Sequence, residues 1–185
     1  MPVDLASLRI QCYPAPMLRN KAAPIENITD ETRAVADRMI QMMYDSEGIG
    51  LAAPQVGLSW RMFVVHVPED EGRSPATDPP SATLGPEVYI NPILTNPTGP
   101  VEPYEEGCLS LPDIRGQVQR PPNITITATG LDGKQFTRTA SGLLARCWQH
   151  ESDHLDGVLI IDRMMQMSRL KCRSALRDLE RDFEG

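Results

Sequence analysis

The chain has 185 residues, the length of one domain that can bury about 70% of its extended surface. It carries 18 Lys and Arg against 25 Asp and Glu, so the formal net charge is −7. This acidic balance disfavours binding to nucleic-acid backbones, because their phosphates attract Lys and Arg. The 4 cysteines form no C-x-x-C pair, which excludes a zinc ribbon and a thioredoxin-like motif and argues against a disulfide framework.

The N-terminal segment has no basic patch leading into an apolar stretch, so no signal peptide is visible. No apolar run approaches the ~18 residues that a bilayer-spanning helix needs. We therefore expect a soluble protein of a reducing cytosol, with no membrane partner. An organellar origin is also compatible with the sequence, because removal of a transit peptide leaves no trace.

The first predicted elements are a helix and two strands. A helix is expected over residues 28–44, because Thr29 suits its N-cap and an apolar stripe follows at helical spacing. The stripe consists of Val35, Met39, Met42 and Met43. Residues 61–67 and 87–94 are short β-branched or aromatic runs bounded by Pro and Gly, which predicts strands. Between them, the Pro-rich segment 68–86 predicts a surface-loop insertion.

The later elements complete an α+β pattern. Residues 124–128 alternate apolar with polar side chains and predict a strand, and residues 140–156 predict a helix that stops at Gly157. Residues 168–183 mix charges and predict a last helix. No repeat or compositional break divides the chain, so we expect a single domain over residues 1–185.

The predicted helix over residues 140–156 carries a candidate metal site. His150-Glu-Ser-Asp-His154 is an H-E-x-x-H segment, and helical geometry places both imidazoles on one face, one turn apart. Two neutral imidazoles at this spacing can bind one metal ion. In such motifs Glu151 can reach a metal-bound water and move its proton.

A catalytic metal site needs a third protein ligand, and several residues are candidates. Downstream of His154 there is no further histidine, and the carboxylates available there are Asp156, Asp162, Glu180 and Glu184. Upstream, Cys108 lies in Glu106-Gly-Cys-Leu-Ser110, a turn-like setting that makes it the better donor. Cys147 is another candidate, but packing beside the site is the more economical interpretation for it.

A third cluster, Gly48-Ile-Gly-Leu-Ala-Ala-Pro-Gln55, follows the first predicted helix. It is a tight glycine loop, but it has neither the G-x-G-x-x-G spacing nor the lysine of a phosphate-binding loop. Gln55 is its unusual residue. A neutral side-chain amide at this place can donate a hydrogen bond to a developing oxyanion without adding charge.

These three segments, in this order, resemble the signature motifs of the peptide deformylases. The resemblance covers most of the chain, from Tyr13-Pro-Ala-Pro-Met-Leu-Arg19 to His154-Leu-Asp-Gly157. It implies antiparallel or mixed β-sheets packed around a central helix that carries H-E-x-x-H, with a C-terminal helix. Two features depart from the family pattern: the serine at position 152 and the length of the 68–86 segment.

The resemblance implies hydrolysis of the N-formyl group from the formyl-methionine of newly synthesised proteins, with release of formate, in a bacterial cytoplasm. The implied metal ligands are Cys108 as thiolate and the two histidines, 150 and 154. A metal bound there lowers the pKa of its water, and the resulting hydroxide attacks the formyl carbon. Glu151 would act as general base and acid, while the Gln55 side chain and the Leu109 backbone N–H would stabilise the oxyanion.

Further positions are assigned to substrate binding. The resemblance implies main-chain contacts with an extended peptide at Ile49, Gly50 and Gly107, and a contact of Arg115 with the substrate backbone. Helical spacing from His150 back along the same face predicts a wall for the methionine pocket, with core packing as the alternative. This wall consists of Leu143, Arg146 and Cys147.

Metal identity rests on donor chemistry and on the resemblance. One thiolate and two imidazoles suit zinc or ferrous iron. The resemblance favours one Fe(2+) per chain in the cell, with Zn(2+), Ni(2+) or Co(2+) as possible substitutes.

The sequence leaves two other functions open. An H-E-x-x-H metallopeptidase would need a third ligand downstream of His154, and a non-catalytic ribosome-associated module would keep only a structural metal. The last helix begins with three basic residues that permit a transient ribosome contact, but acidic residues follow them, so we expect no specific nucleic-acid binding. The basic residues are Arg169, Lys171 and Arg173.

Overall fold

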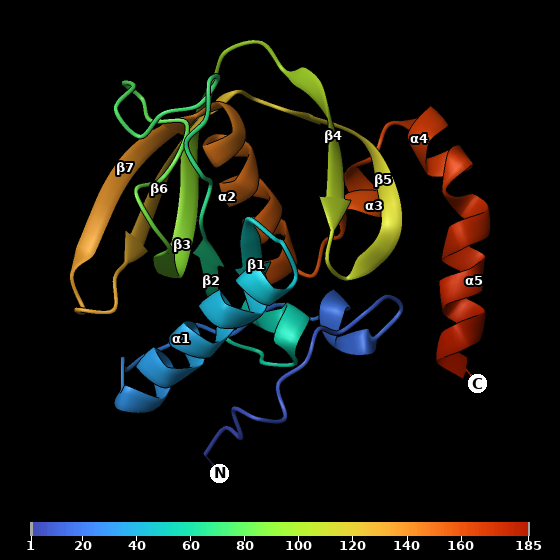
Figure 1. Cartoon of the computed structure of the whole chain (residues 1–185), viewed down its shortest axis with the longest axis horizontal. Coiled ribbons are helices and arrows are strands. Elements are labelled where there is room, and N and C mark those ends of the chain that lie inside the picture. The colour runs from blue at the N-terminus through green and yellow to red at the C-terminus, as the bar shows by residue number, and fades with distance from the viewer. Residues whose placement is uncertain (1, 185) are drawn as a thin grey trace.

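The computed structural model describes residues 2–184 of the chain, without the side chain of Glu184 (Figure 1). The strands are β1 (Gly50–Ala52), β2 (Met62–Val65), β3 (Glu87–Thr98), β4 (Glu102–Cys108), β5 (Leu111–Arg120), β6 (Asn123–Thr129) and β7 (Gln135–Ser141). The helices are α1 (Asp30–Asp45), α2 (Gly142–Leu155), α3 (Ile160–Arg163), α4 (Gln166–Lys171) and α5 (Arg173–Glu184). Short 3-10 turns cover Pro16–Arg19 and Ala53–Val56. None of the described helices combines the length and the apolar character that crossing a bilayer requires.

The strands form two antiparallel sheets on either side of α2. One sheet has five strands in the order β1-β2-β3-β6-β7, and the other is the β4–β5 hairpin. Figure 1 shows α2 in the centre, with the larger sheet on one side and the hairpin on the other. The α+β class, with sheets around the H-E-x-x-H helix and a C-terminal helix, is confirmed.

Helix α1 forms for the reasons read from its sequence. Thr29 caps it: the Thr29 hydroxyl accepts a hydrogen bond from the backbone N–H of Thr32, and the Thr29 N–H is bound by the Thr32 side chain. The predicted stripe is buried against β1 and β2, with Val35, Met39 and Met43 fully covered. The long α1 face therefore supports the strand that borders the site.

Helix α2 is buried on most of its surface, because it lies between two sheets. Trp148 fills the space toward the five-stranded sheet and is 0% exposed. The helix ends at Leu155, and Gly157 adopts φ 72° just beyond it, as the sequence predicted. A Cβ at Gly157 would lie 2.4 Å from the Arg19 carbonyl oxygen, so glycine is required on steric grounds too.

Four strands were not predicted, and their composition explains why. Strand β4 exposes most of its side chains and contains a proline, while β7 is an edge strand whose sequence is largely polar. Strand β5 also contains a proline and charged residues, and β1 has only three residues. Such strands lack the apolar alternation from which sequence patterns are recognised. The predicted strands at β2, β3 and β6 are present, with β3 extending to Thr98.

Residues 68–86 form the predicted irregular segment between β2 and β3, and hydrogen bonds hold it against the start of α2. The Ser141 N–H donates to the Pro80 carbonyl at 2.9 Å, and the Ser141 hydroxyl donates to the Pro79 carbonyl at 2.9 Å. A tight turn at residues 70–73 is closed by reciprocal backbone hydrogen bonds between Asp70 and Arg73.

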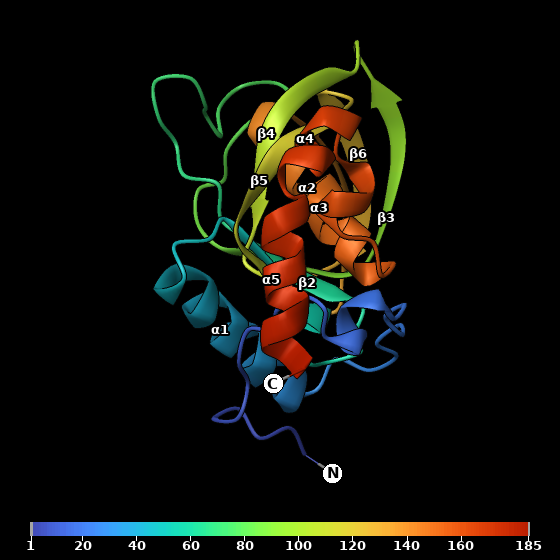
Figure 2. The same cartoon turned by 90° about the vertical axis from the view of Figure 1, so that its right-hand side faces the viewer.

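The C-terminal segment packs outside the hairpin. Figure 2 shows α4 and α5 in front of β5, with α5 running toward the C-terminus. One helix was predicted over residues 168–183, but the structure has two, α4 and α5, the first of which begins at Gln166. They are separated at Cys172, whose thiol lies 3.3 Å from the Arg115 carbonyl oxygen. Leu176 and Leu179 face the cluster beneath the hairpin.

Candidate metal centre and active site

Three potential metal ligands converge between β4 and α2. Cys108 ends β4 at the two-residue turn to β5, and His150 and His154 lie one turn apart on α2. The Cys108 Sγ is 3.3 Å from His154 Nε2, and the two Nε2 atoms are 3.2 Å apart. All three ligand atoms lie within 4.8 Å of one another, and among the described residues they form a group able to hold a metal ion.

These separations fit a single tetrahedral ion. Two nitrogens bound at usual zinc distances lie about 3.3 Å apart, and a sulfur and a nitrogen about 3.6 Å apart. The Nε2–Nε2 distance of 3.2 Å and the sulfur–Nε2 distance of 3.3 Å are close to these values. The donor set and its spacing therefore fit a divalent metal.

Glu106 fixes the orientation of His150. Its carboxylate lies 3.1 Å from His150 Nδ1, so Nε2 faces the other two ligands. The same carboxylate accepts hydrogen bonds from Arg120 at 2.8 and 3.0 Å and from Arg146 at 2.9 Å. Arg120 continues to Asp153 at 2.8 Å, so one charged network ties β4, β5 and α2 together around the ligands.

The protonation of these groups follows from burial and charge. Burial alone would raise the pKa of Glu106, but the hydrogen bonds from His150 and Arg120 outweigh it and hold the pKa well below its usual range. Burial would lower the pKa of His150, whereas Cys108 and Glu106 raise it well above the ordinary value. Burial also lowers the pKa of His154, which favours the neutral imidazole that a metal requires.

The alternative third ligands are otherwise engaged. Burial raises the pKa of the Cys147 thiol well above its ordinary value, and its sulfur lies 3.6 Å from the Ile49 carbonyl oxygen. Cys147 is therefore a packing residue beside the site. The downstream carboxylates pair elsewhere: Asp156 with Arg61, Asp162 with Arg19, and Glu180 with Tyr13. The side chain of Glu184 lies outside the described residues.

Gln55 is held rigidly beside the metal ligands. Its side-chain oxygen accepts the Ala52 N–H at 2.8 Å, which fixes the direction of the amide. Its Nε2 donates to the Ser110 hydroxyl at 3.1 Å and lies 3.5 Å from the Cys108 sulfur. The 3-10 turn over Ala53–Val56 thus aims a neutral donor at the ligand cluster.

Glu151 is the buried carboxylate of the site. It is 3% exposed, and its Oε2 has no hydrogen-bond partner among residues 2–184. Burial raises the pKa of Glu151 to about 7. The close approach of β1 depends on Gly50, because a Cβ there would lie 2.3 Å from Glu151 Oε1 and 2.8 Å from the Cys147 sulfur.

A cavity of about 600 Å³ brings nearly all the predicted site residues together. The members that line it are Ile49, Gly50, Gln55, Gly107, Cys108, Leu109, Arg115, Leu143, Arg146, Cys147, His150 and Glu151. His154 is 1% exposed and does not line this cavity. Arg115 is exposed on β5, directly opposite Gly107. Arg146 lines the cavity wall, and its guanidinium donates a hydrogen bond to the Glu106 carboxylate.

Some structural roles in the site were not anticipated from sequence. The orienting role of Glu106 had a signal, because alternation along a strand places it on the same face as Cys108, two residues later. The partnership of Ser110 with Gln55 joins segments 55 residues apart, and no local pattern indicates it. The same holds for Arg120, which reaches Glu106 across the hairpin.

Comparison with known proteins agrees with this site. A family model described as polypeptide deformylase matches residues 7–170. The chain is 44% identical to the peptide deformylase of Agrobacterium fabrum over 157 residues, covering 84% of this chain and 86% of that protein. It is 40% identical to the peptide deformylase of Acinetobacter baumannii over 180 residues, covering 97% and 96%.

A solved structure is similar as well. The peptide deformylase of Plasmodium falciparum superposes with a TM-score of 0.84 at 34% identity, covering 95% of this chain and 97% of that one. The sequence match, the fold and the cysteine–histidine cluster agree, and the chain belongs to the peptide deformylase family of enzymes.

Proposed function

We propose that this chain removes the N-formyl group from the formyl-methionine of newly synthesised proteins and releases formate. The observation that carries the proposal is the convergence of the Cys108 sulfur and the two histidine Nε2 atoms at a cavity that also contains Glu151 and Gln55. Residues 1–185 would act as one catalytic domain. The H-E-x-x-H metallopeptidase alternative is not supported, because the downstream carboxylates whose side chains the structure describes, Asp156, Asp162 and Glu180, are paired elsewhere.

Cys108, His150 and His154 would hold the metal. A bound divalent cation supplies a Lewis acid that polarises the formyl oxygen and makes a water molecule acidic enough to react near neutral pH. Cys108 would bind the metal as a thiolate, and Glu106 keeps the His150 ring turned so that Nε2 is available. The donor set suits ferrous iron or zinc, and we favour Fe(2+) in the cell, with Zn(2+), Ni(2+) or Co(2+) as substitutes.

Glu151 would move the proton. Its carboxylate lies in the cavity wall next to His150, and Oε2 is free of partners within the described chain. From this position it can accept a proton from the attacking water and deliver it to the departing amine. Its burial keeps bulk water from competing for that proton.

Gln55 and Leu109 would stabilise the oxyanion. Hydrogen bonds with the Ala52 N–H and the Ser110 hydroxyl fix the Gln55 amide before the substrate binds. Little reorganisation is therefore needed as negative charge develops on the formyl oxygen. Leu109 is the first residue of the turn after Cys108, and its backbone N–H would be the second donor.

The substrate would bind as an extended strand. β1 is an edge strand of the larger sheet, and β4 borders the cavity from the other side. Ile49, Gly50 and Gly107 would make main-chain contacts, and Arg115 would contact the peptide backbone. The methionine side chain would lie along the α2 wall formed by Leu143, Arg146 and Cys147.

The test is formate release from a formyl-methionine peptide by protein loaded with one metal per chain. We expect turnover by the native chain and a loss of roughly a hundredfold to ten-thousandfold in Glu151→Gln. Glu26→Gln, which neutralises an exposed carboxylate outside the cavity, should retain activity. An absence of formate from the metal-loaded native chain, or unchanged turnover in Glu151→Gln, would overturn the proposal.

Metal preference needs a separate comparison. Protein purified without oxygen and reconstituted with Fe(2+) or Zn(2+) should be more active with iron, and equal activities would contradict the iron preference. Cytoplasmic location and a transient ribosome contact through the C-terminal helices stay predictions. The exposed Met167 and Leu170 lie beside the basic Arg169 and Lys171 on α4, which is compatible with such a contact.

A further inference from the structure

An N-terminal segment joins two parts of the active site that are far apart in the sequence. It is the irregular stretch just before the 3-10 turn over Pro16–Arg19, and Figure 1 shows it in blue below the β4–β5 hairpin. The Gln11 N–H donates to the Gln55 carbonyl at 2.7 Å, and the Tyr13 N–H donates to the Ser110 carbonyl at 2.8 Å. One short segment thus holds the backbone of the Gln55 turn and the backbone of the turn that follows Cys108.

The two residues held in this way also bond to each other through their side chains. Gln55 Nε2 donates to the Ser110 hydroxyl at 3.1 Å, and both residues are buried, at 1% and 0% exposed. This bond helps to aim the Gln55 amide at the cavity. Since a misplacement of about 1 Å can cost a hundredfold in rate, the backbone positions of both partners matter for catalysis.

Tyr13 anchors the segment to the C-terminal helix. Its hydroxyl donates to the Glu180 carboxylate of α5 at 2.5 Å, and Glu180 makes no other hydrogen bond or ion pair among residues 2–184. The Tyr13 ring is partly buried in the cluster that contains Leu111 of β5 and Leu176 of α5. Tyr13 therefore binds α5 with its side chain and the hairpin turn with its backbone N–H.

We propose that Tyr13 is a positioning residue for formate release: anchored to Glu180, it holds its N–H against the Ser110 carbonyl and thereby keeps the Gln55 amide aimed at the oxyanion. The inference rests on the proposed function, in which Gln55 stabilises that charge. Tyr13 does not line the cavity, so it touches no substrate and acts through Ser110 and Gln55.

The first test is a kinetic comparison of Tyr13→Phe with the native chain. The change removes the hydroxyl but keeps the ring and the backbone N–H. Because an oxyanion donor acts on charge that develops in the transition state, a poorly aimed Gln55 should lower kcat and leave KM nearly unchanged. We expect kcat to fall roughly threefold to tenfold, the effect that loss of one hydrogen bond supports. As control, Tyr44→Phe removes a hydroxyl that bonds His66 at 2.8 Å outside the cavity, and it should keep kcat.

Two double-mutant cycles separate positioning from a general loss of stability. Glu180→Ala should lower kcat by the same factor as Tyr13→Phe, and the two changes together should lower it no further, because they remove the same bond. In Gln55→Ala, which lacks the amide, adding Tyr13→Phe should change the residual kcat by less than roughly twofold. Urea unfolding of each variant checks that it is folded under the assay conditions.

The outcomes distinguish the positioning role from the proposed function. An unchanged kcat in Tyr13→Phe, a change confined to KM, or additive losses in either cycle would overturn the positioning role alone. An absence of formate from the metal-loaded native chain would overturn the proposed function and the positioning role with it.

Discussion

Replacing Glu106 by Gln should destabilise the fold strongly, because this carboxylate joins three cationic or potentially cationic groups. It is 7% exposed and accepts four hydrogen bonds of 2.8–3.1 Å, two from Arg120, one from Arg146 and one from His150. Glutamine keeps one acceptor oxygen but places an amide NH₂ against donors and leaves the arginines without their negative charge. Breaking a buried ion pair in this way costs about 3–5 kcal/mol.

Urea unfolding of the metal-free proteins measures this cost. The expected loss for Glu106→Gln is about 3 kcal/mol, and Glu105→Gln, one residue earlier and exposed, should change the free energy of unfolding by less than about 0.5 kcal/mol. Loss of the His150 hydrogen bond should also weaken metal affinity by roughly tenfold to a hundredfold in a competitive metal titration. Equal stabilities for the two variants would refute the view that this network holds the hairpin to α2.

The remaining predictions concern packing, pH and metal. Gly50→Ala should lower formate release by roughly a hundredfold, because its Cβ would displace Glu151, whereas Gly85→Ala meets nothing within 4 Å and should be as active as the native chain. Burial raises the pKa of Tyr89 well above its ordinary value, so the unfolded state alone ionises above pH 10 and stability falls as pH rises. Between pH 10 and 11 the native chain should lose about 1 kcal/mol more than Tyr89→Phe in urea unfolding, and parallel losses would contradict this assignment. Metal at a hundred times its Kd should raise the free energy of unfolding by about 2.7 kcal/mol, reversibly with a chelator, and no shift would argue against binding to the folded site.

The catalytic cluster was predictable because its residues lie in short sequence motifs whose local geometry is known. The spacing of His150 and His154 within one helix fixes their geometry, and Cys108 has a recognisable turn beside it. The choice of Cys108 over Cys147 was less direct, since both are near the histidines. Burial decides it: Cys147 is enclosed and has a strongly raised thiol pKa, whereas Cys108 faces the cavity and the imidazoles.

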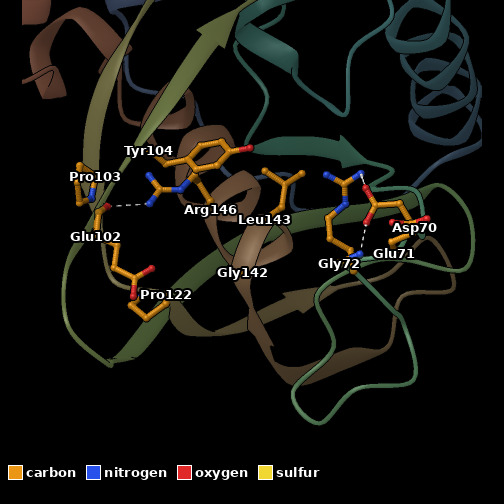
Figure 3. Close-up of a pocket in the computed structure, with 11 residues that line it drawn as sticks. Asp70, Glu71, Gly72, Glu102, Pro103, Tyr104, Pro122, Gly142, Leu143 and Arg146 are labelled. Atoms are coloured by element: carbon orange, nitrogen blue, oxygen red, sulfur yellow. Dashed lines mark hydrogen bonds and ion pairs between the residues drawn. The ribbon is translucent and has the colours of Figure 1, made fainter.

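The parts that were not predicted depend on contacts between distant segments. The β4–β5 hairpin has a weak apolar pattern because one of its strands exposes most side chains, so only pairing across the hairpin defines it. The Arg120–Glu106 bond and the Ser110–Gln55 bond likewise appear only once the chain has folded. A cavity lined by the 70–73 turn, the start of β4 and the start of α2 (Figure 3) is another case, because the turn and the start of β4 are about thirty residues apart in the sequence.

The central claim is that Cys108, His150 and His154 hold one divalent metal on which formate release depends. Its most direct test titrates metal-free protein with Fe(2+) under anaerobic conditions and follows formate release from a formyl-methionine peptide at each addition. Activity should rise in proportion to added metal and level off at one ion per chain, and Cys108→Ala should show no such rise. Full activity in the metal-free protein, or an unchanged titration in Cys108→Ala, would contradict the claim.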